Sequence, residues 1–159
     1  LNAFTDGQDL IAREGMLVAS AMAAVAFKKG LGGVHALAHP LGARYHKHHG
    51  LLNAILLPYV LIANQAAISF DIARLARYLE LQQPDFNGFL DWVLDLRQRL
   101  GIPHSLQLIG IDHEAASWVG EQALADISSS DTNACVLSAA DYSQIFRNAV
   151  HGVLPGVTP

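Results

Sequence analysis

The sequence predicts an all-α fold, a bundle-like domain of several helices. No stretch shows sustained alternation of apolar and polar residues, helical periodicity runs almost throughout, and glycine or proline separates the periodic segments. The chain has 159 residues, of which 52% are hydrophobic and 15% charged, so it is long enough to bury a sizeable core. About seven helices packed as one domain satisfy these observations.

Glycine and proline delimit the helices of the first half. Gly30 follows two lysines and ends the first helix, as a glycine after a helix commonly does. Pro40 disturbs the second helix, and Gly50 opens the third. A fourth segment places apolar residues on one face and its two arginines outside that face. The predicted helices span residues 7–29, 33–45, 51–64 and 69–81.

Capping residues mark the helices of the second half. Asp112 is placed as an N-cap, and Ser138 with Asp141 resembles a capping box in which Asp replaces the usual Glu. The segment GIPHSLQLIGI reads as a connector, and the polar run DISSSDTNACV separates the last two helices. The predicted helices span residues 85–100, 113–125 and 138–151.

Composition argues against two kinds of partner. The net charge is −4 without a basic cluster, so we expect no nucleic acid. The apolar segments 15–27 and 51–64 are shorter than the ~20 apolar residues of a membrane span or carry Asn and Pro, so we expect buried core helices and no membrane. No signal peptide is visible, and the single Cys135 excludes an internal disulfide. Both points favour a cytoplasmic protein.

Five of the eight histidines lie in one stretch, LGGVHALAHPLGARYHKHHG. His35 and His39 are four residues apart, so on a continuous helix they share one face. A residue before proline disfavours the α conformation, so Pro40 favours a kink that turns His39 elsewhere. His49 stands where the chain can turn between two helices, and a second helix could present it to His35. The histidines are therefore either ordinary polar residues or ligands of a divalent metal ion.

The coordination shell is incomplete in this sequence. Two imidazoles usually need at least one carboxylate or another nitrogen to hold Fe²⁺ or Zn²⁺. No histidine precedes His35, so no upstream Asp-x-x-x-His pair is present. His46 and His48 read as exposed polar residues of the turn.

The segment FKKGLGGVHALAHPLGARYHKHHGLLNAILLPYVLIAN, residues 27–64, carries a longer pattern. It combines GLG before the first histidine, HALAHPLGA, the HHG turn and NAILLPYV. This series resembles the signature of iron-containing alcohol dehydrogenases, in the dehydroquinate synthase-like superfamily. The resemblance continues more weakly through GIPHSLQLIGI and through DISSSDTNACVLSAADYSQIFRNAV. In the last segment Asn133-Ala134 replaces the usual Asn-Pro.

The resemblance implies that residues 1–159 are the C-terminal, metal-binding helical domain of a two-domain enzyme. An N-terminal domain that binds NAD or NADP would then be absent from this chain. Of the four metal ligands of the family, the resemblance assigns the last two to His35 and His49 and places the first Asp and His upstream. It makes His39 a residue of the cleft near the metal and the nicotinamide, with a catalytic role.

The implied activity is the reversible oxidation of a primary alcohol to an aldehyde. A divalent metal, Fe²⁺ ahead of Zn²⁺, would polarise the oxygen while hydride passes to the nicotinamide. His39 would relay the alcohol proton or hold the nicotinamide, and Phe27 and Leu31 are candidates for the substrate wall. The fragment alone is expected to be inactive. A helical interaction module without catalysis is the alternative, and a homo-oligomer is left open because bared apolar faces would permit association.

Overall fold

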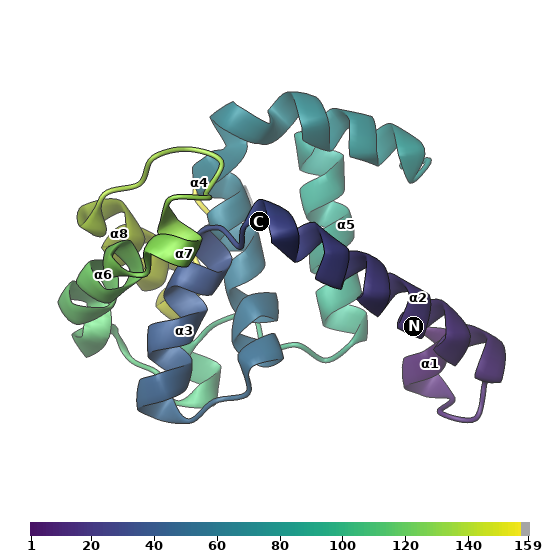
Figure 1. The fold of residues 1–159 in the computed structure, drawn as a ribbon, viewed down its shortest axis with the longest axis horizontal. Coiled ribbons are helices and arrows are strands. Elements are labelled where there is room, and N and C mark those ends of the chain that lie inside the picture. The colour runs from purple at the N-terminus through teal and green to yellow at the C-terminus, as the bar shows by residue number, and fades with distance from the viewer. Residues whose placement is uncertain (157–159) are drawn as a thin grey trace. The chain divides into compact units, whose positions relative to one another are not determined.

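The computed structural model describes residues 1–156, and within them the chain forms eight α-helices and no strand. This confirms the all-α fold class. The chain divides into two compact units, Leu1–Gly30 and Leu31–Pro159. Each unit is described separately below, with the elements labelled as in Figure 1.

The first unit consists of α1 (Asn2–Thr5), α2 (Leu10–Ala26) and the 3₁₀ turn η1 (Phe27–Lys29). The Asp9 side chain accepts a hydrogen bond from the Ala12 N–H and caps α2. Gly30 ends the segment with a φ of 108°, as the sequence predicts. No residue of α2 is buried, so the prediction of a buried core helix over 15–27 is wrong for this unit. A short helix and a turn are too small to cover it.

The second unit carries the remaining helices (Figure 1). The predicted N-caps Asp112 and Ser138 are confirmed, because each side chain accepts a backbone N–H at a helix start. Asp85 caps α5 in the same way, at the predicted start of that helix. Ser138 and Asp141 form the predicted capping box. The elements are α3 (Gly33–Tyr45), α4 (His49–Tyr78), α5 (Phe86–Arg99), η2 (Gln107–Ile109), η3 (His113–Ala115), α6 (Ala116–Ala125), α7 (Ile127–Ser130) and α8 (Ala139–His151).

One predicted boundary is wrong. The helices expected over 51–64 and 69–81 form the single helix α4, whose ribbon changes direction along its length (Figure 1). The intervening residues Gln-Ala-Ala-Ile contain neither glycine nor proline, so nothing local ends the helix. The Ser69 hydroxyl donates to the Gln65 carbonyl at 2.6 Å, one turn back, which is compatible with a continuous helix.

The main core joins α3, α4, α6 and α8. Leu37, Leu56 and Phe146 are fully buried members of it, each at 0% exposure. A smaller cluster of Ala76, Phe89 and Val93 joins the second half of α4 to α5. The core therefore fixes α3 against α4, and these are the two helices that carry the clustered histidines.

Two helices among the described residues are long and apolar enough to cross a membrane by length and composition. They are Leu10–Lys29 and His49–Tyr78. None of the most apolar 18-residue stretch of the first is buried, whereas 39% of the corresponding stretch of the second is buried. The second helix is thus a core helix, as predicted for residues 51–64. The absence of a membrane partner stays a prediction.

Candidate functional site

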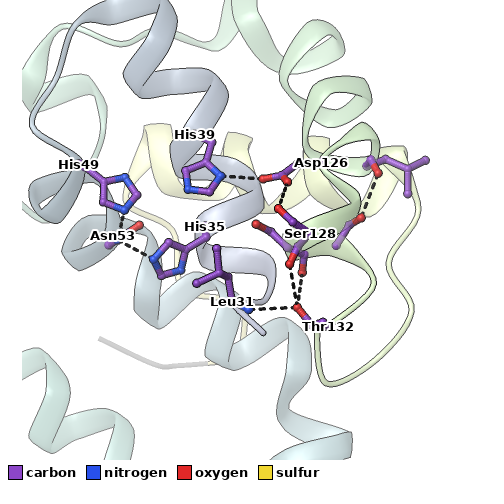
Figure 2. Close-up of polar contacts among 11 residues, drawn as sticks. Leu31, His35, His39, His49, Asn53, Asp126, Ser128 and Thr132 are labelled. Carbon is purple, nitrogen blue, oxygen red and sulfur yellow. Dashed lines mark hydrogen bonds and ion pairs between the residues drawn. The ribbon is translucent and has the colours of Figure 1, made fainter. Parts of the chain in front are cut away.

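Three imidazole rings meet between α3 and the start of α4. The ring centroids of His35 and His49 are 5.2 Å apart, those of His39 and His49 5.3 Å, and those of His35 and His39 5.6 Å. Figure 2 shows His35 and His39 on α3 with His49 facing them from α4. The helix α3 continues through Pro40, so the expectation that the proline turns His39 away is wrong. The shared helical face predicted from the four-residue spacing is present.

Asn53 connects two of these rings. Its Nδ2 lies 3.3 Å from Nε2 of His35 and 3.1 Å from Nε2 of His49. An amide nitrogen only donates, so both Nε2 atoms face it as acceptors. Oδ1 of Asn53 is buried and has no hydrogen-bond partner within residues 1–156. Two imidazole lone pairs from different helices thus converge on one electropositive group.

The environment of His35 favours a neutral ring. Burial lowers the pKa of His35, and the nearby His49 and His39 lower it further. A hydrogen bond with the backbone of Leu31 acts in the opposite direction, and the net shift of the pKa is downward. A neutral imidazole is the form that binds a metal ion.

His39 is held from the opposite side. Its Nδ1 lies 2.7 Å from Oδ2 of Asp126, which follows the end of α6 (Figure 2). The Ser128 hydroxyl donates to the other carboxylate oxygen at 2.6 Å. Burial raises the pKa of Asp126, but the hydrogen bonds from Ser128 and His39 outweigh that effect and hold the pKa below its usual value. The pair borders an open hollow of about 380 Å³.

The start of α3 is tied to the loop that follows α7. The Leu31 N–H donates to Oγ1 of Thr132 at 3.1 Å, and the Gly33 N–H donates to Oδ1 of Asn133 at 3.0 Å. A Cβ on Gly33 would stand 3.0 Å from that oxygen, a tight contact that favours glycine at this position. Asn133 also exchanges two amide hydrogen bonds with Asn64 of α4, at 2.8 and 2.9 Å. These bonds fix the turn that precedes His35.

The other predicted residues lie as follows. Leu31 adjoins the cluster through its backbone contact with His35. Phe27 belongs to η1 of the first unit and is 55% exposed. His46 is exposed and ends α3 at a left-handed φ of 51°, and His48 accepts the Leu51 N–H and caps α4. Both are exposed turn residues, as expected.

Sequence reasoning missed Asn53 and Asp126. Asn53 lies four residues after His49 on one helix, so the spacing that pairs His35 with His39 could also have found it. Asp126 has no comparable signal, because it contacts His39 across 87 residues of sequence. Only the fold brings them together.

The chemistry of the donor set tests whether these residues fit a metal ion. Among residues 1–156 no group of three or more His, Cys, Asp or Glu side chains could hold one by itself. His35 and His49 nevertheless direct their Nε2 atoms at one point, the Asn53 amide nitrogen, whose two N–H groups can donate to both. The two histidines therefore fit as part of a coordination shell, to which other ligands must contribute.

Proteins similar to this chain are dehydrogenases or oxidoreductases of alcohols and hydroxy acids. The 4-hydroxybutyrate dehydrogenase of Cupriavidus necator is 39% identical over 154 residues, which cover 91% of this chain and 40% of that protein. The NAD-dependent methanol dehydrogenase of Bacillus methanolicus is 30% identical over 158 residues, covering 93% and 40%. The crystal structure of a 1,3-propanediol oxidoreductase superposes with a TM-score of 0.88 at 31% identity, covering 93% of this chain and 40% of that one.

These similarities define the class as the helical part of an alcohol dehydrogenase. The model of the Fe-containing alcohol dehydrogenase family, C-terminal, matches residues 1–150. The chain therefore belongs to the iron-containing alcohol dehydrogenase family, as its C-terminal domain, which confirms the predicted resemblance. The chain spans about two fifths of the length of the relatives it matches.

Proposed function

We propose that this chain is the metal-binding helical part of an enzyme that reversibly oxidises a small primary alcohol to an aldehyde. NAD or NADP would be the hydride acceptor, bound by an N-terminal nucleotide-binding domain outside residues 1–159. One observation carries the proposal: Nε2 of His35 and Nε2 of His49 converge on the Asn53 amide nitrogen from two helices. Membership of the iron-containing family supports the same reaction class.

His35 and His49 would hold a divalent metal, Fe²⁺ ahead of Zn²⁺, together with ligands from the rest of the enzyme. When bound, the metal supplies Lewis acidity at the substrate oxygen. The lowered pKa of His35 supports this role, because the ring stays neutral over a wider pH range. The Asn53 amide would keep the two rings oriented, and the backbone of Leu31 would also hold His35.

His39 would act beside the metal rather than as a ligand. Its Nδ1 faces Asp126, so a neutral ring carries its lone pair on Nε2, where it can accept the proton of the alcohol. His39 and Asp126 also border an open surface hollow, which His35 and His49 do not line. Leu31 and Phe27 each remain a proposed candidate for a substrate-contacting residue, as the resemblance implies.

The substrate class and the second domain draw support from the relatives and from α2. Two relatives carry methanol and 1,3-propanediol in their names, and one of these names includes NAD.

The side chains of α2 are exposed although most are apolar, for example Leu10 at 73% and Ile11 at 84%. Such a surface is typical of a segment that another part of a protein covers. A cytoplasmic location is part of the proposal.

A chimera tests the proposed function. This chain would replace the matching part of the Cupriavidus necator 4-hydroxybutyrate dehydrogenase, which supplies the remaining domain. We expect metal-dependent reduction of NAD or NADP with a primary alcohol, and one metal ion bound per chain by elemental analysis. His49→Ala should lower the bound metal and the turnover together. His151→Ala, an exposed histidine of α8, is the matched control and should change neither.

The outcomes separate the parts of the proposal. Unchanged metal content in the His49→Ala chimera would remove His49 from the ligand set. A chimera that folds and binds metal but never turns over any alcohol would refute the reaction. The 159-residue chain alone is expected to bind metal weakly and to show no turnover, because it supplies only two of the ligands and no nucleotide site. Turnover by that chain would contradict the proposal that the remaining ligands and the nucleotide site come from another part of the enzyme.

A further inference from the structure

The contact between His39 and Asp126 fixes where His39 carries its proton. Nδ1 of His39 lies 2.7 Å from Oδ2 of Asp126. An ionised carboxylate has no proton to donate, so Nδ1–H is the donor whether the ring is neutral or charged. The exposed fractions of the His39 and Asp126 side chains are 40% and 19%, so the carboxylate is the better shielded partner, and both side chains border the hollow.

Asp126 is itself held at several points. The Ser128 hydroxyl donates to its Oδ1 at 2.6 Å, while its backbone carbonyl accepts the N–H groups of Ser129 and Ser130 at 2.9 and 2.8 Å. Asp126 is thus the N-cap residue of the short helix α7, and the first turn of that helix is hydrogen-bonded to it. Because the carboxylate cannot swing freely, it imposes an orientation on the His39 ring rather than following it.

The same segment contacts α3 at a second point. Thr132 follows α7 and accepts the Leu31 N–H just before α3 begins (Figure 2). Residues 126–132 therefore contact α3 near its start through Thr132 and two turns later through Asp126. This two-point attachment fixes the rotation of α3 relative to α7, and with it the direction of the His39 side chain.

We propose that Asp126 is a positioning residue that keeps the proton of neutral His39 on Nδ1 and so presents Nε2 to the substrate as proton acceptor. The proposal rests on the proposed function for its catalytic meaning. The alcohol proton would pass from the substrate oxygen to Nε2 of His39, giving an imidazolium whose charge the ionised Asp126 stabilises. Asp126 keeps its charge throughout and gains no proton, as in other His–Asp pairs.

Nitrogen-15 NMR of the labelled 159-residue chain tests the tautomer without metal, cofactor or turnover. At a pH where His39 is neutral we expect Nδ1 to give the signal of a protonated ring nitrogen and Nε2 that of an unprotonated one. Asp126→Ala should shift His39 to the opposite tautomer, which free imidazoles favour. Asp126→Asn, which keeps the size of the side chain, should give both tautomers because its amide can accept or donate.

Asp131→Ala, an exposed carboxylate in the same loop, is the matched control and should leave the His39 signals unchanged. A protonated Nε2 in the unmodified chain would overturn the proposal. His39 signals that stay the same in Asp126→Asn would also overturn it, and this variant serves if Asp126→Ala does not fold.

In the active chimera, Asp126→Asn should lower kcat by up to about 100-fold with little change in KM or bound metal. Asp126→Glu should restore part of the lost kcat.

If Asp126 had only a structural role, its replacement would lower the stability without changing the His39 tautomer and without a selective loss of kcat over KM. That result would refute the proposal. The NMR result also separates this proposal from the proposed function. Failure of the unmodified chimera to oxidise alcohols would refute the reaction but would leave the tautomer and its dependence on Asp126 as measured.

Discussion

Two long apolar helices, α2 and α4, have opposite environments. Both satisfy the length and composition expected of a membrane span. None of the most apolar 18-residue stretch of the α2 segment is buried, whereas 39% of that of α4 is. The difference lies in their neighbours. Within its compact unit α2 packs only with α1 and η1, while α3, α5 and α8 pack against α4.

This comparison teaches that apolar composition predicts a helix but not its burial. An apolar side chain contributes to stability in proportion to the area that its neighbours remove from water. The histidine cluster depends on the buried case. His49 and Asn53 stand on the packed first half of α4, so their alignment with α3 is maintained by a core that α2 lacks. Substitutions in the two regions should therefore differ sharply.

The largest effect is expected at the buried helix. Leu56 of α4 is 0% exposed, so Leu56→Ala removes buried methyl groups and leaves a cavity. We expect the free energy of unfolding of the 159-residue chain to fall by about 2–5 kcal/mol, a range typical of such substitutions. Chemical denaturation followed by circular dichroism measures it. A loss within the range of surface substitutions would show that the α4 core is not what stabilises the second unit.

The second largest effect is expected at the amide pair that ties α4 to the loop after α7. Asn133→Ala removes the acceptor of the buried Asn64 Nδ2 group and of the Gly33 N–H, while Oδ1 of Asn64 keeps the Cys135 thiol as a donor. Unsatisfied buried groups cost roughly 1–3 kcal/mol, so the unfolding free energy should fall by that amount. Asn87→Ala, at an exposed position of α5, is the control and should be nearly neutral. Equal effects of both variants would contradict a stabilising role of the pair.

Most helices of the second unit could be predicted from local signals. Asp85, Asp112 and the Ser138 capping box mark real boundaries there, as Gly30 does in the first unit, because caps act within one turn and are visible in sequence. The break expected after residue 64 is absent, since an apparent change of pattern is not a stop signal. The burial of α2 could not be predicted, because burial depends on neighbours distant in sequence.

The candidate site shows the same limit. The proximity of His35 and His49 could be expected from two helices joined by a short turn, and the rings do lie 5.2 Å apart. The effect of Pro40 on His39 was wrongly predicted, because backbone preference before proline is weaker than the packing of α3 and the contact with Asp126. Asp126 itself reaches the site only through the packing of α6 against α3.

A smaller effect is expected at the cap of α8, which packs against α4. Hydrogen bonds from the Ser138 side chain and backbone lower the pKa of Asp141 from its ordinary value of 3.8. A carboxyl whose pKa is lower in the folded state stabilises the fold above its unfolded pKa and loses that contribution as the pH falls through the folded value. Ser138→Ala should lower the unfolding free energy by about 1 kcal/mol near neutral pH.

The two effects at this cap can be separated by pH. Asp141→Asn should make the unfolding free energy less dependent on pH below about 4, because the carboxyl that titrates there is removed. Denaturation curves recorded from neutral to acidic pH measure the slope. An unchanged slope in Asp141→Asn would show that the capping box does not contribute to the acid sensitivity of the chain.

The smallest effect in the isolated chain is expected at α2. Leu17 is 73% exposed, so Leu17→Ala should change the unfolding free energy by no more than about 0.5 kcal/mol. In the chimera the same substitution should cost more, because we expect the remaining part of the enzyme to cover the apolar side chains of α2. Melting temperatures of both proteins, each with and without the substitution, measure the contrast. Equal, small effects in both would mean that α2 stays exposed in the assembled enzyme, and its composition would then need another explanation.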